Sequence, residues 1–234
     1  MRMRALLISH EEAGKPGVVG EILDSRGIKT QRHVILGADG ILNLDFPDPT
    51  EFDFIVSFGS FHSAYDPEVA TWVDAEEELI TSTLDQEVPF LGVCFGGQVL
   101  AKAVGGSVEK SDELELGELH IKETSLGLPF PEGPWFSWHG DRMILPDHIE
   151  VLAETPSAVQ VFRHKTAVGL QFHPEATPEL VQGWLDIGGA NYLPAGMTSE
   201  LLMAEVNNMA QDAADNCKVL VDWFISEYVN SKKS

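Results

Sequence analysis

Short, uninterrupted apolar runs alternate with amphipathic segments of helical spacing over residues 5–106, and this alternation constrains the fold most strongly. Apolar runs predict strands at residues 5–8, 33–36, 52–58 and 89–93. Apolar side chains three and four positions apart predict helices at residues 17–26, 66–86 and 96–104. A repeated strand–helix–strand order predicts a parallel sheet with helices on both faces.

The pattern changes after residue 106. Shorter apolar stretches bounded by turn residues predict strands at 118–123, 149–154, 159–164 and 167–172. The last two stretches flank His164, Lys165 and Thr166, which predicts a hairpin. We therefore expect a doubly wound, mostly parallel sheet with antiparallel strands added at one edge.

Two helices are expected near the C-terminal end, at residues 178–186 and roughly 199–229. Neither an internal repeat nor a linker-like stretch interrupts the sequence. The prediction is a single domain over residues 1–234, with residues 186–234 as its C-terminal helical extension.

The chain is strongly acidic, with 37 Asp and Glu against 15 Lys and Arg and a formal charge of −22. Nucleic-acid binding depends on basic side chains that neutralise phosphates, so the charge argues against a nucleic-acid partner and against an anionic membrane surface. No apolar run approaches the roughly 20 residues that span a bilayer. The first apolar run is too short for a signal peptide, so a cytoplasmic location is expected.

Residues 89–98 carry the most informative chemistry. An apolar strand leads directly into Gly92, Val93, Cys94, Phe95 and Gly96, a cysteine version of the nucleophile elbow. A sharp strand-to-helix turn would lift the thiol above the sheet edge and place it at a helix N-terminus, which favours the thiolate. The alternative is a small buried cysteine in a glycine-rich turn.

His173 follows another apolar strand, and Pro174 and Glu175 come next. A nucleophilic cysteine needs an imidazole to share its proton, and the imidazole needs a carboxylate to hold its tautomer. The carboxyl ends of parallel strands meet at one edge, where ligands bind in open α/β sheets. Cys94 and His173 are therefore expected at the same edge, although His173 could also simply end its strand.

Together these motifs resemble the class I (triad) glutamine amidotransferases. The stretches that carry the resemblance are Gly-Val-Cys-Phe-Gly-Gly-Gln at residues 92–98, Gln-Phe-His-Pro-Glu at 171–175 and Phe-Ser-Trp-His-Gly-Asp at 136–141. The chain is most similar in style to the glutaminase domain of GMP synthase and its free-standing relatives. The resemblance implies a flavodoxin-like class I glutamine amidotransferase fold.

The resemblance also implies residue roles. Cys94 would attack the side-chain amide of glutamine, His173 would act as general base and acid, and Glu175 would orient His173. Water would then hydrolyse the resulting thioester to glutamate, after release of ammonia. The Phe95 N–H would be one oxyanion donor, and Gln98 would lie near the bound substrate.

The predicted oxyanion loop departs from the family pattern. After the third strand the family usually has Gly-Gly-Pro, whereas this chain has Gly59, Ser60 and Phe61. The Ser60 N–H remains available as the second donor, with Gly59 beside it, because only proline removes the backbone donor. Different φ/ψ preferences leave open whether the hole is preformed. His62 in this loop could contact substrate or lie on the solvated surface.

Other polar residues have weaker expectations. His139, Gly140 and Asp141 are expected on a loop between strands, where His139 and Asp141 either line the substrate site or form an ordinary turn. Neither a metal-binding motif nor a nucleotide-binding glycine loop is recognisable, so no metal and no cofactor are expected. Cys217 is expected as a packing residue in the last helix.

Three functions remain open from the sequence. The first is a glutaminase that supplies ammonia to a separate synthase subunit or acceptor, and the acidic surface suggests a partner with a basic face. The second is a hydrolase of γ-glutamyl peptides or amides with the same three residues. The third is a non-catalytic regulatory module. The sequence also leaves open whether the chain forms a homo-oligomer.

Overall fold

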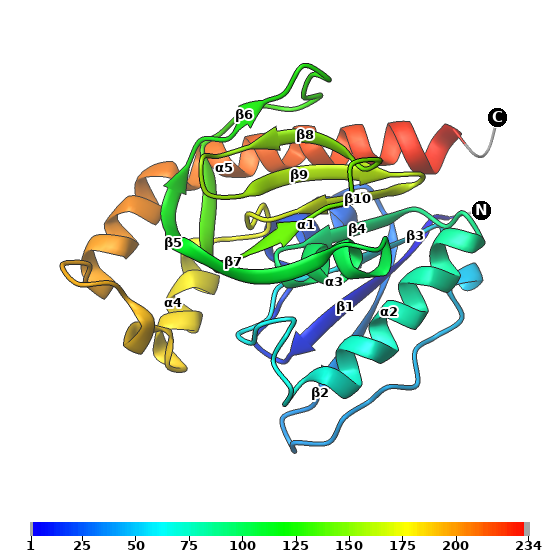
Figure 1. The fold of residues 1–234 in the computed structure, drawn as a ribbon, viewed down its shortest axis with the longest axis horizontal. Coiled ribbons are helices and arrows are strands. Elements are labelled where there is room, and N and C mark those ends of the chain that lie inside the picture. Colours follow the sequence, from blue (N-terminus) through cyan, green and yellow to red (C-terminus); the bar gives the residue numbers. More distant parts are fainter. Residues whose placement is uncertain (1, 232–234) are drawn as a thin grey trace.

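One eight-stranded sheet organises the chain (Figure 1). The computed structural model describes residues 2–231. The strands lie in the order β2 (Lys29–Leu36), β1 (Arg4–Glu11), β3 (Phe54–Ser57), β4 (Phe90–Val93), β10 (Ala167–Leu170), β9 (Val159–His164), β8 (Glu150–Glu154) and β6 (Lys122–Glu123). Strands from β2 to β10 pair in parallel, and β9, β8 and β6 extend that edge antiparallel. The expected mixed sheet is therefore confirmed.

Apolar runs form the central strands because both faces of the sheet are covered. Every residue of β3, β4 and β10 is buried. Leu170 pairs with Val93 at the carboxyl ends of β10 and β4. The segments that follow these two strands therefore emerge level with each other at one sheet edge.

Helices cover the two faces of the sheet in separate layers. One apolar cluster joins the sheet to α1 (Gly17–Ser25) and α5 (Ser199–Phe224), and a second joins it to α2 (Ala70–Asp85) and α3 (Phe95–Ala103). The strand order β2-β1-β3 reverses direction at β1, which makes the carboxyl ends of β1 and β3 a topological switch point. This position is where doubly wound sheets bind their ligands.

A separate two-stranded sheet was not predicted. β5 (Ser107–Leu119) pairs antiparallel with β7 (Trp135–Ile144), with an irregularity between Lys110 and Glu115. The strand expected at residues 118–123 is instead divided between the end of β5 and the short β6. Polar residues dominate β5 because much of it faces solvent, so its sequence has no continuous apolar run.

Helix α2 begins later than the helix predicted at residues 66–86. It begins at Ala70, because Asp66 caps a preceding turn by accepting a hydrogen bond from the Glu68 N–H. Most acidic residues of this stretch are exposed, yet Glu76 is fully buried. The exposed residues of the same stretch, such as Glu78, do lie on the solvent side.

The C-terminal segment packs against the rest of the chain. α4 (Pro178–Asp186) and α5 follow the predicted bounds closely, and α5 continues into a π-helical turn at Ile225–Asn230. Cys217 is fully buried in the cluster that joins α5 to the sheet, and burial raises the pKa of its thiol. The single domain with a helical extension stays a prediction, and residues 1 and 232–234 of it lie outside the described residues.

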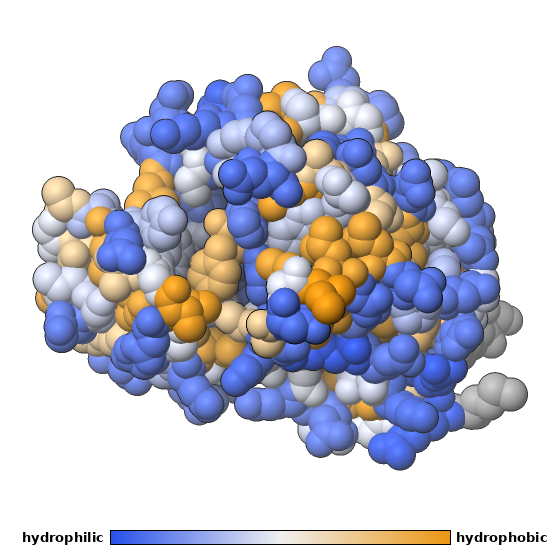
Figure 2. All heavy atoms as spheres, turned by 90° about the horizontal axis from the view of Figure 1, so that it is seen from below, coloured by the Kyte–Doolittle hydropathy of each residue, from blue (hydrophilic) through white to orange (hydrophobic). Residues whose placement is uncertain are grey.

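Figure 2 shows a largely hydrophilic surface with hydrophobic residues gathered in the middle of one face.

Short 3-10 turns at Pro49–Glu51 and Gly189–Tyr192 lie between the longer elements. Within residues 2–231, every helix is too short or too polar to cross a lipid bilayer.

Candidate active site

Cys94 occupies a strained turn between β4 and α3. Its φ of 50° and ψ of −106° are rarely adopted by residues other than glycine, and such strain is often found at functional sites. The Cys94 N–H donates to the Leu170 carbonyl at 2.9 Å, so β10 holds the turn from the neighbouring strand. This is the geometry of a nucleophile elbow.

The glycines around Cys94 permit the turn by close backbone contact. A Cβ atom on Gly92 would lie 2.5 Å from the Gly96 carbonyl oxygen. A Cβ on Gly96 would lie 2.4 Å from the Ser57 carbonyl oxygen, and one on Gly97 would lie 2.4 Å from that of Leu170. Any side chain at these positions would push α3 away from the sheet.

The structure brings His173 and Glu175 to the same edge as Cys94. The His173 N–H donates to the Phe136 carbonyl at 2.8 Å, which fixes the backbone after β10 against β7. His173 Nδ1 lies 2.8 Å from Glu175 Oε1, and His173 and Cys94 both lie against Gly59 and line the same pocket. Because Nδ1 contacts the carboxylate, Nε2 is the ring nitrogen free to face the sulfur.

Electrostatics favour a charged imidazole at this position. Burial lowers the pKa of His173, but the negative charges of Cys94 and Glu175 and hydrogen bonds to both raise it well above its ordinary value. A protonated imidazole next to a cysteine sulfur is the arrangement that favours a nucleophilic thiolate. Glu175 Oε2 is buried and has no hydrogen-bond partner among the described residues.

Two glutamines line the sulfur on the side of α3. Gln171 Nε2 donates to Cys94 Sγ at 3.8 Å, and Gln98 Nε2 lies 3.4 Å from Gln171 Oε1. Both side chains are buried. Gln98 was expected near the substrate, whereas Gln171 was part of the His173 motif without a predicted role.

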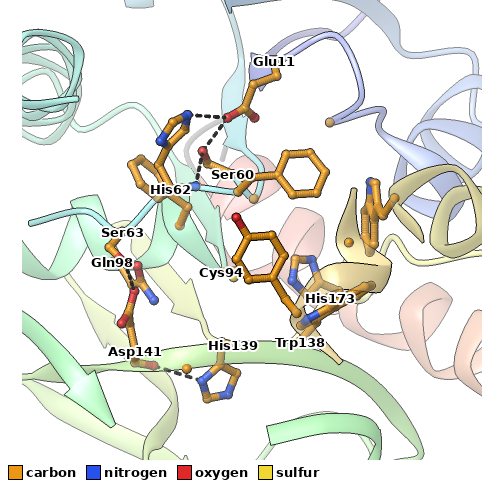
Figure 3. Close-up of a pocket in the computed structure, with 18 of the residues that line it drawn as sticks. Glu11, Ser60, His62, Ser63, Cys94, Gln98, Trp138, His139, Asp141 and His173 are labelled. Carbon is orange, nitrogen blue, oxygen red and sulfur yellow. Dashed lines mark hydrogen bonds and ion pairs between the residues drawn. The ribbon is translucent and has the colours of Figure 1, made fainter. Parts of the chain in front are cut away.

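The loop after β3 lies directly against Cys94 and His173. A Cβ on Gly59 would be 2.8 Å from His173 Cε1 and 3.7 Å from Cys94 Cβ. The Ser60 hydroxyl donates to Glu11 Oε1 at 2.7 Å and accepts from the His62 N–H at 3.2 Å (Figure 3). Side-chain bonds to Ser60 therefore hold a loop that lacks the family's Gly-Gly-Pro.

His139 and Asp141 belong to strand β7, so their prediction on a loop was wrong. Gly140 resembles a turn former in sequence, but pairing with β5 keeps this stretch extended. His139 is buried, with Nδ1 2.9 Å from the Asp141 carbonyl and Nε2 2.9 Å from Glu115 Oε2. Burial raises the pKa of Glu115, but the hydrogen bonds and charge of His139 and other partners outweigh it and lower the pKa.

Asp141 ties β7 to the segment before α2. Its carboxylate accepts hydrogen bonds from the Ser63 hydroxyl at 2.7 Å and from the Tyr65 hydroxyl at 2.9 Å. Figure 3 shows Ser63 and Asp141 on one side of Cys94 and His173 on the other. Sequence reasoning missed Ser63 and Tyr65, since nothing local marks them as partners of a strand more than 70 residues away.

These elements enclose a pocket of about 480 Å³ with Cys94 in its wall. Its lining includes every predicted site residue: Cys94, His173, Glu175, Phe95, Ser60, Gly59, Gln98, His139 and Asp141. Large side chains that are partly exposed surround the mouth: Phe61, Tyr65, Leu114 and Tyr192. The lining of the site therefore combines polar groups near the sulfur with exposed apolar side chains.

Comparison with known proteins identifies the family. The sequence model of the family "Glutamine amidotransferase class-I" matches residues 39–183, more than half of the chain. The chain belongs to this family. A putative glutamine amidotransferase-like protein, YfeJ of Salmonella typhimurium, is 30% identical over 193 residues, which cover 77% of this chain and 79% of that protein.

Glutamine-hydrolysing GMP synthases are similar to a shorter part of the present chain. The GMP synthase of Staphylococcus saprophyticus is 39% identical over 106 residues, or 40% of this chain. The chain spans about a fifth of the length of the GMP synthases it matches.

Solved structures of glutamine amidotransferases have the same fold. The structure from Thermotoga maritima has a TM-score of 0.84 at 26% identity and covers 97% of this chain and 100% of that one. A second structure, from Methylobacillus flagellatus, has a TM-score of 0.80 at 20% identity, with 97% of this chain and 95% of that one covered. The class I glutamine amidotransferase fold expected from the sequence is thus confirmed.

Proposed function

We propose that the chain hydrolyses the side-chain amide of glutamine through a thioester on Cys94. The observation that carries this proposal is the strained Cys94 turn in a pocket wall, with a His173–Glu175 pair beside the thiol. Membership of the class I glutamine amidotransferase family supports the same chemistry. A binding module would have no physical need for all three groups in this arrangement.

In the proposed reaction, the Cys94 thiolate attacks the amide carbon and the carbonyl oxygen becomes an oxyanion. His173 gives its proton to the departing nitrogen, the carbon–nitrogen bond breaks and ammonia leaves. Water then attacks the γ-glutamyl thioester while His173 accepts its proton. Glutamate is released, and the Cys94 thiolate and protonated His173 are restored.

Two backbone donors are proposed for the oxyanion. The Phe95 N–H lies in the first turn of α3, where helical N–H groups have no partner within the helix. The Ser60 N–H belongs to the loop that contacts Cys94 and His173 through Gly59. Removal of one such donor from acyl-transfer enzymes typically costs on the order of 100–1,000-fold in rate.

Substrate contacts are proposed for Gln98 and Asp141. Gln98 lines the pocket next to Gln171, which contacts the sulfur, and its side chain can bond the amide end of glutamine. The Asp141 carboxylate faces the pocket and suits the α-ammonium group of an amino acid. His139 would position Asp141 through its contact with the Asp141 carbonyl.

The ammonia is proposed to serve a separate synthase subunit or another acceptor. Free ammonia becomes ammonium in water at neutral pH, so transfer requires a docked acceptor. Glutamine-hydrolysing GMP synthases among the relatives support this role, and the charge of −22 favours an acceptor with a basic face.

The test is a glutaminase assay paired with mass spectrometry of the whole chain. Glutamate release and a covalent adduct of a glutamine-derived chloroketone on Cys94, both absent in Cys94→Ala, are the expected results. Buried Cys217 serves as the internal control and stays unlabelled. A wild-type chain without turnover and without adduct contradicts the proposal and favours a regulatory binding module.

A γ-glutamyl peptide or amide is the second candidate substrate, favoured by the size and the apolar opening of the pocket. Phe61, Tyr65 and Tyr192 are 53%, 47% and 76% exposed at its mouth, where a larger leaving group could bind. Comparison of kcat/KM for glutamine and γ-glutamyl dipeptides distinguishes the two substrates. A peptide that turns over while glutamine does not would replace the first candidate.

A further inference from the structure

A buried ion pair lies behind the loop that contacts Cys94, and the proposed reaction leaves it without a role. His10 at the end of β1 and Glu76 in α2 are both fully buried, and His10 Nε2 lies 2.7 Å from Glu76 Oε2. Burying an ionisable pair costs several kcal/mol per ion unless geometry and further hydrogen bonds compensate. The pair therefore requires a physical explanation.

Both ends of the pair make one more hydrogen bond. The Ser57 hydroxyl donates to Glu76 Oε1, and His10 Nδ1 lies 3.2 Å from the Gly59 carbonyl oxygen. A carbonyl can only accept, so Nδ1 is the donor in this contact. The network thus runs from the end of β3 through α2 and β1, and returns to the loop that follows β3.

Two aromatic rings pack against the imidazole of His10 and restrict its orientation. Phe95 and Trp72 contact its ring edge-to-face, at centroid distances of 4.5 and 5.6 Å. Burial lowers the pKa of His10, but the charge and hydrogen bond of Glu76, the charge of Glu11 and the Gly59 bond together raise it. The contact with the Gly59 carbonyl places a proton on Nδ1.

The Gly59 carbonyl and the Ser60 N–H belong to one peptide group. In a planar trans peptide the C=O and the N–H point in opposite directions. A bond from His10 to the carbonyl therefore directs the Ser60 N–H away from His10. Gly59 itself lies against the predicted catalytic residues, since a Cβ there would lie 2.8 Å from His173 Cε1 and 3.7 Å from Cys94 Cβ.

We propose that His10 and Glu76 are positioning residues that set the Gly59–Ser60 peptide so that the Ser60 N–H faces the oxyanion. The inference rests on the proposed function, because the oxyanion forms only in that reaction. The loop at residues 59–61 lacks the Gly-Gly-Pro sequence that is usual in the family. A polar network replaces the backbone restriction that Gly-Gly-Pro provides elsewhere in the family. His10 also lies outside the residues that the family model matches.

The test compares two double variants that differ only in the donor. His10→Asn/Glu76→Gln keeps an amide nitrogen that can take the place of Nδ1, whereas His10→Leu/Glu76→Gln has none at similar size. Both remove the buried charges and the ring packing equally. We expect kcat for the leucine variant to be on the order of 100-fold below that of the asparagine variant, with KM changed less than about threefold.

Alkylation of Cys94 by iodoacetamide is the control reaction, because it needs the thiolate but develops no oxyanion. Its rate is expected to agree within about twofold between the two variants. Equal kcat values for the variants, or a parallel loss of alkylation, would overturn the positioning role. Thermal denaturation checks that both variants are folded.

Crystal structures of the two variants test the orientation of the Gly59–Ser60 peptide directly, without any measurement of turnover. The Gly59–Ser60 peptide is expected to rotate in the leucine variant and to keep its present orientation in the asparagine variant. An unrotated peptide in both contradicts the inference even if activity falls. If wild-type enzyme turns over neither glutamine nor γ-glutamyl peptides, the proposed function fails and peptide orientation alone decides the inference.

Discussion

At the scale of single residues, Cys94 joins a strained backbone to a charged environment. Its positive φ lifts the thiol out of the strand direction, and the Leu170 carbonyl holds the turn. His173 and Glu175 supply opposite and compensating charges within hydrogen-bonding distance. The reactivity proposed for the thiol thus depends on a conformation that costs free energy of folding.

The raised pKa of His173 predicts a pH dependence. In the proposed reaction, activity is present while His173 is protonated and is lost as pH rises through its pKa. Glu175→Gln removes one of the charges that raise this pKa, so the alkaline limb of the kcat/KM profile should move to lower pH. Steady-state rates between about pH 5 and 10 measure the shift. An alkaline limb unmoved by the substitution would show that Glu175 does not set this pKa.

Gly59→Ala is predicted to lower activity without unfolding the protein. The new Cβ would meet the His173 ring at 2.8 Å and push it away from Cys94. Misplacement of a reacting group by about 1 Å can cost on the order of 100-fold in rate. Measured kcat should fall by at least tenfold, at a melting temperature close to that of the wild type. Full activity of this variant would mean that His173 has room to move.

Local sequence identified the residues that carry the proposed chemistry but not those that support them. Cys94 and His173 are marked by glycines and by preceding apolar runs. Glu76 is one of three consecutive glutamates and has no such mark, although it alone of the three is fully buried. Its burial depends on which side of α2 faces β1, and that is decided by packing.

At the scale of elements, the site depends on helix α3 packing directly against the strands through glycines. Gly92, Gly96 and Gly97 remove the side chains that would separate the two, and the first turn of α3 then reaches Ser57 and Leu170. β7 closes the opposite side through the Phe136 carbonyl and Asp141. The pocket forms where α3, β7 and the carboxyl ends of the central strands meet.

A matched pair of glycine substitutions tests the close packing of α3. Gly96→Ala would place a Cβ 2.4 Å from the Ser57 carbonyl, so we expect the free energy of unfolding to fall by about 1–3 kcal/mol or more, as overpacked cores do. Gly183→Ala lies within α4 with open space around it, and should raise stability by roughly 0.5–1 kcal/mol. Urea denaturation measures both. Similar effects in the two variants would refute the packing argument.

At the scale of the whole molecule, the charge of −22 is the dominant property of the surface. Self-repulsion of like charges destabilises the compact state and is screened by salt. Acidic residues on the solvent side of α2, such as Asp74, Glu78 and Asp85, contribute to it. An acceptor subunit with a basic face would relieve the same repulsion on docking.

Salt is therefore predicted to stabilise the protein. The melting temperature should rise between about 10 and 300 mM sodium chloride, by roughly 2–4 °C for each kcal/mol that screening contributes. The variant Asp74→Asn/Glu78→Gln/Asp85→Asn changes the formal charge from −22 to −19, since it removes three negative charges. The melting temperature of this variant should rise less with salt than that of the wild type. A melting temperature that does not respond to salt would exclude charge repulsion as a main cost of folding.

The sequence by itself predicted the mixed α/β sheet and singled out Cys94, His173 and Glu175 as candidate catalytic residues. Apolar periodicity reports which faces are buried, and a nucleophile elbow has a local pattern of glycines. Tertiary structure alone decided the β5–β7 sheet, the Asp141 contacts and the His10–Glu76 pair. These depend on which distant segments meet, and a buried polar side chain looks the same in sequence as a solvated one until its partner is in place.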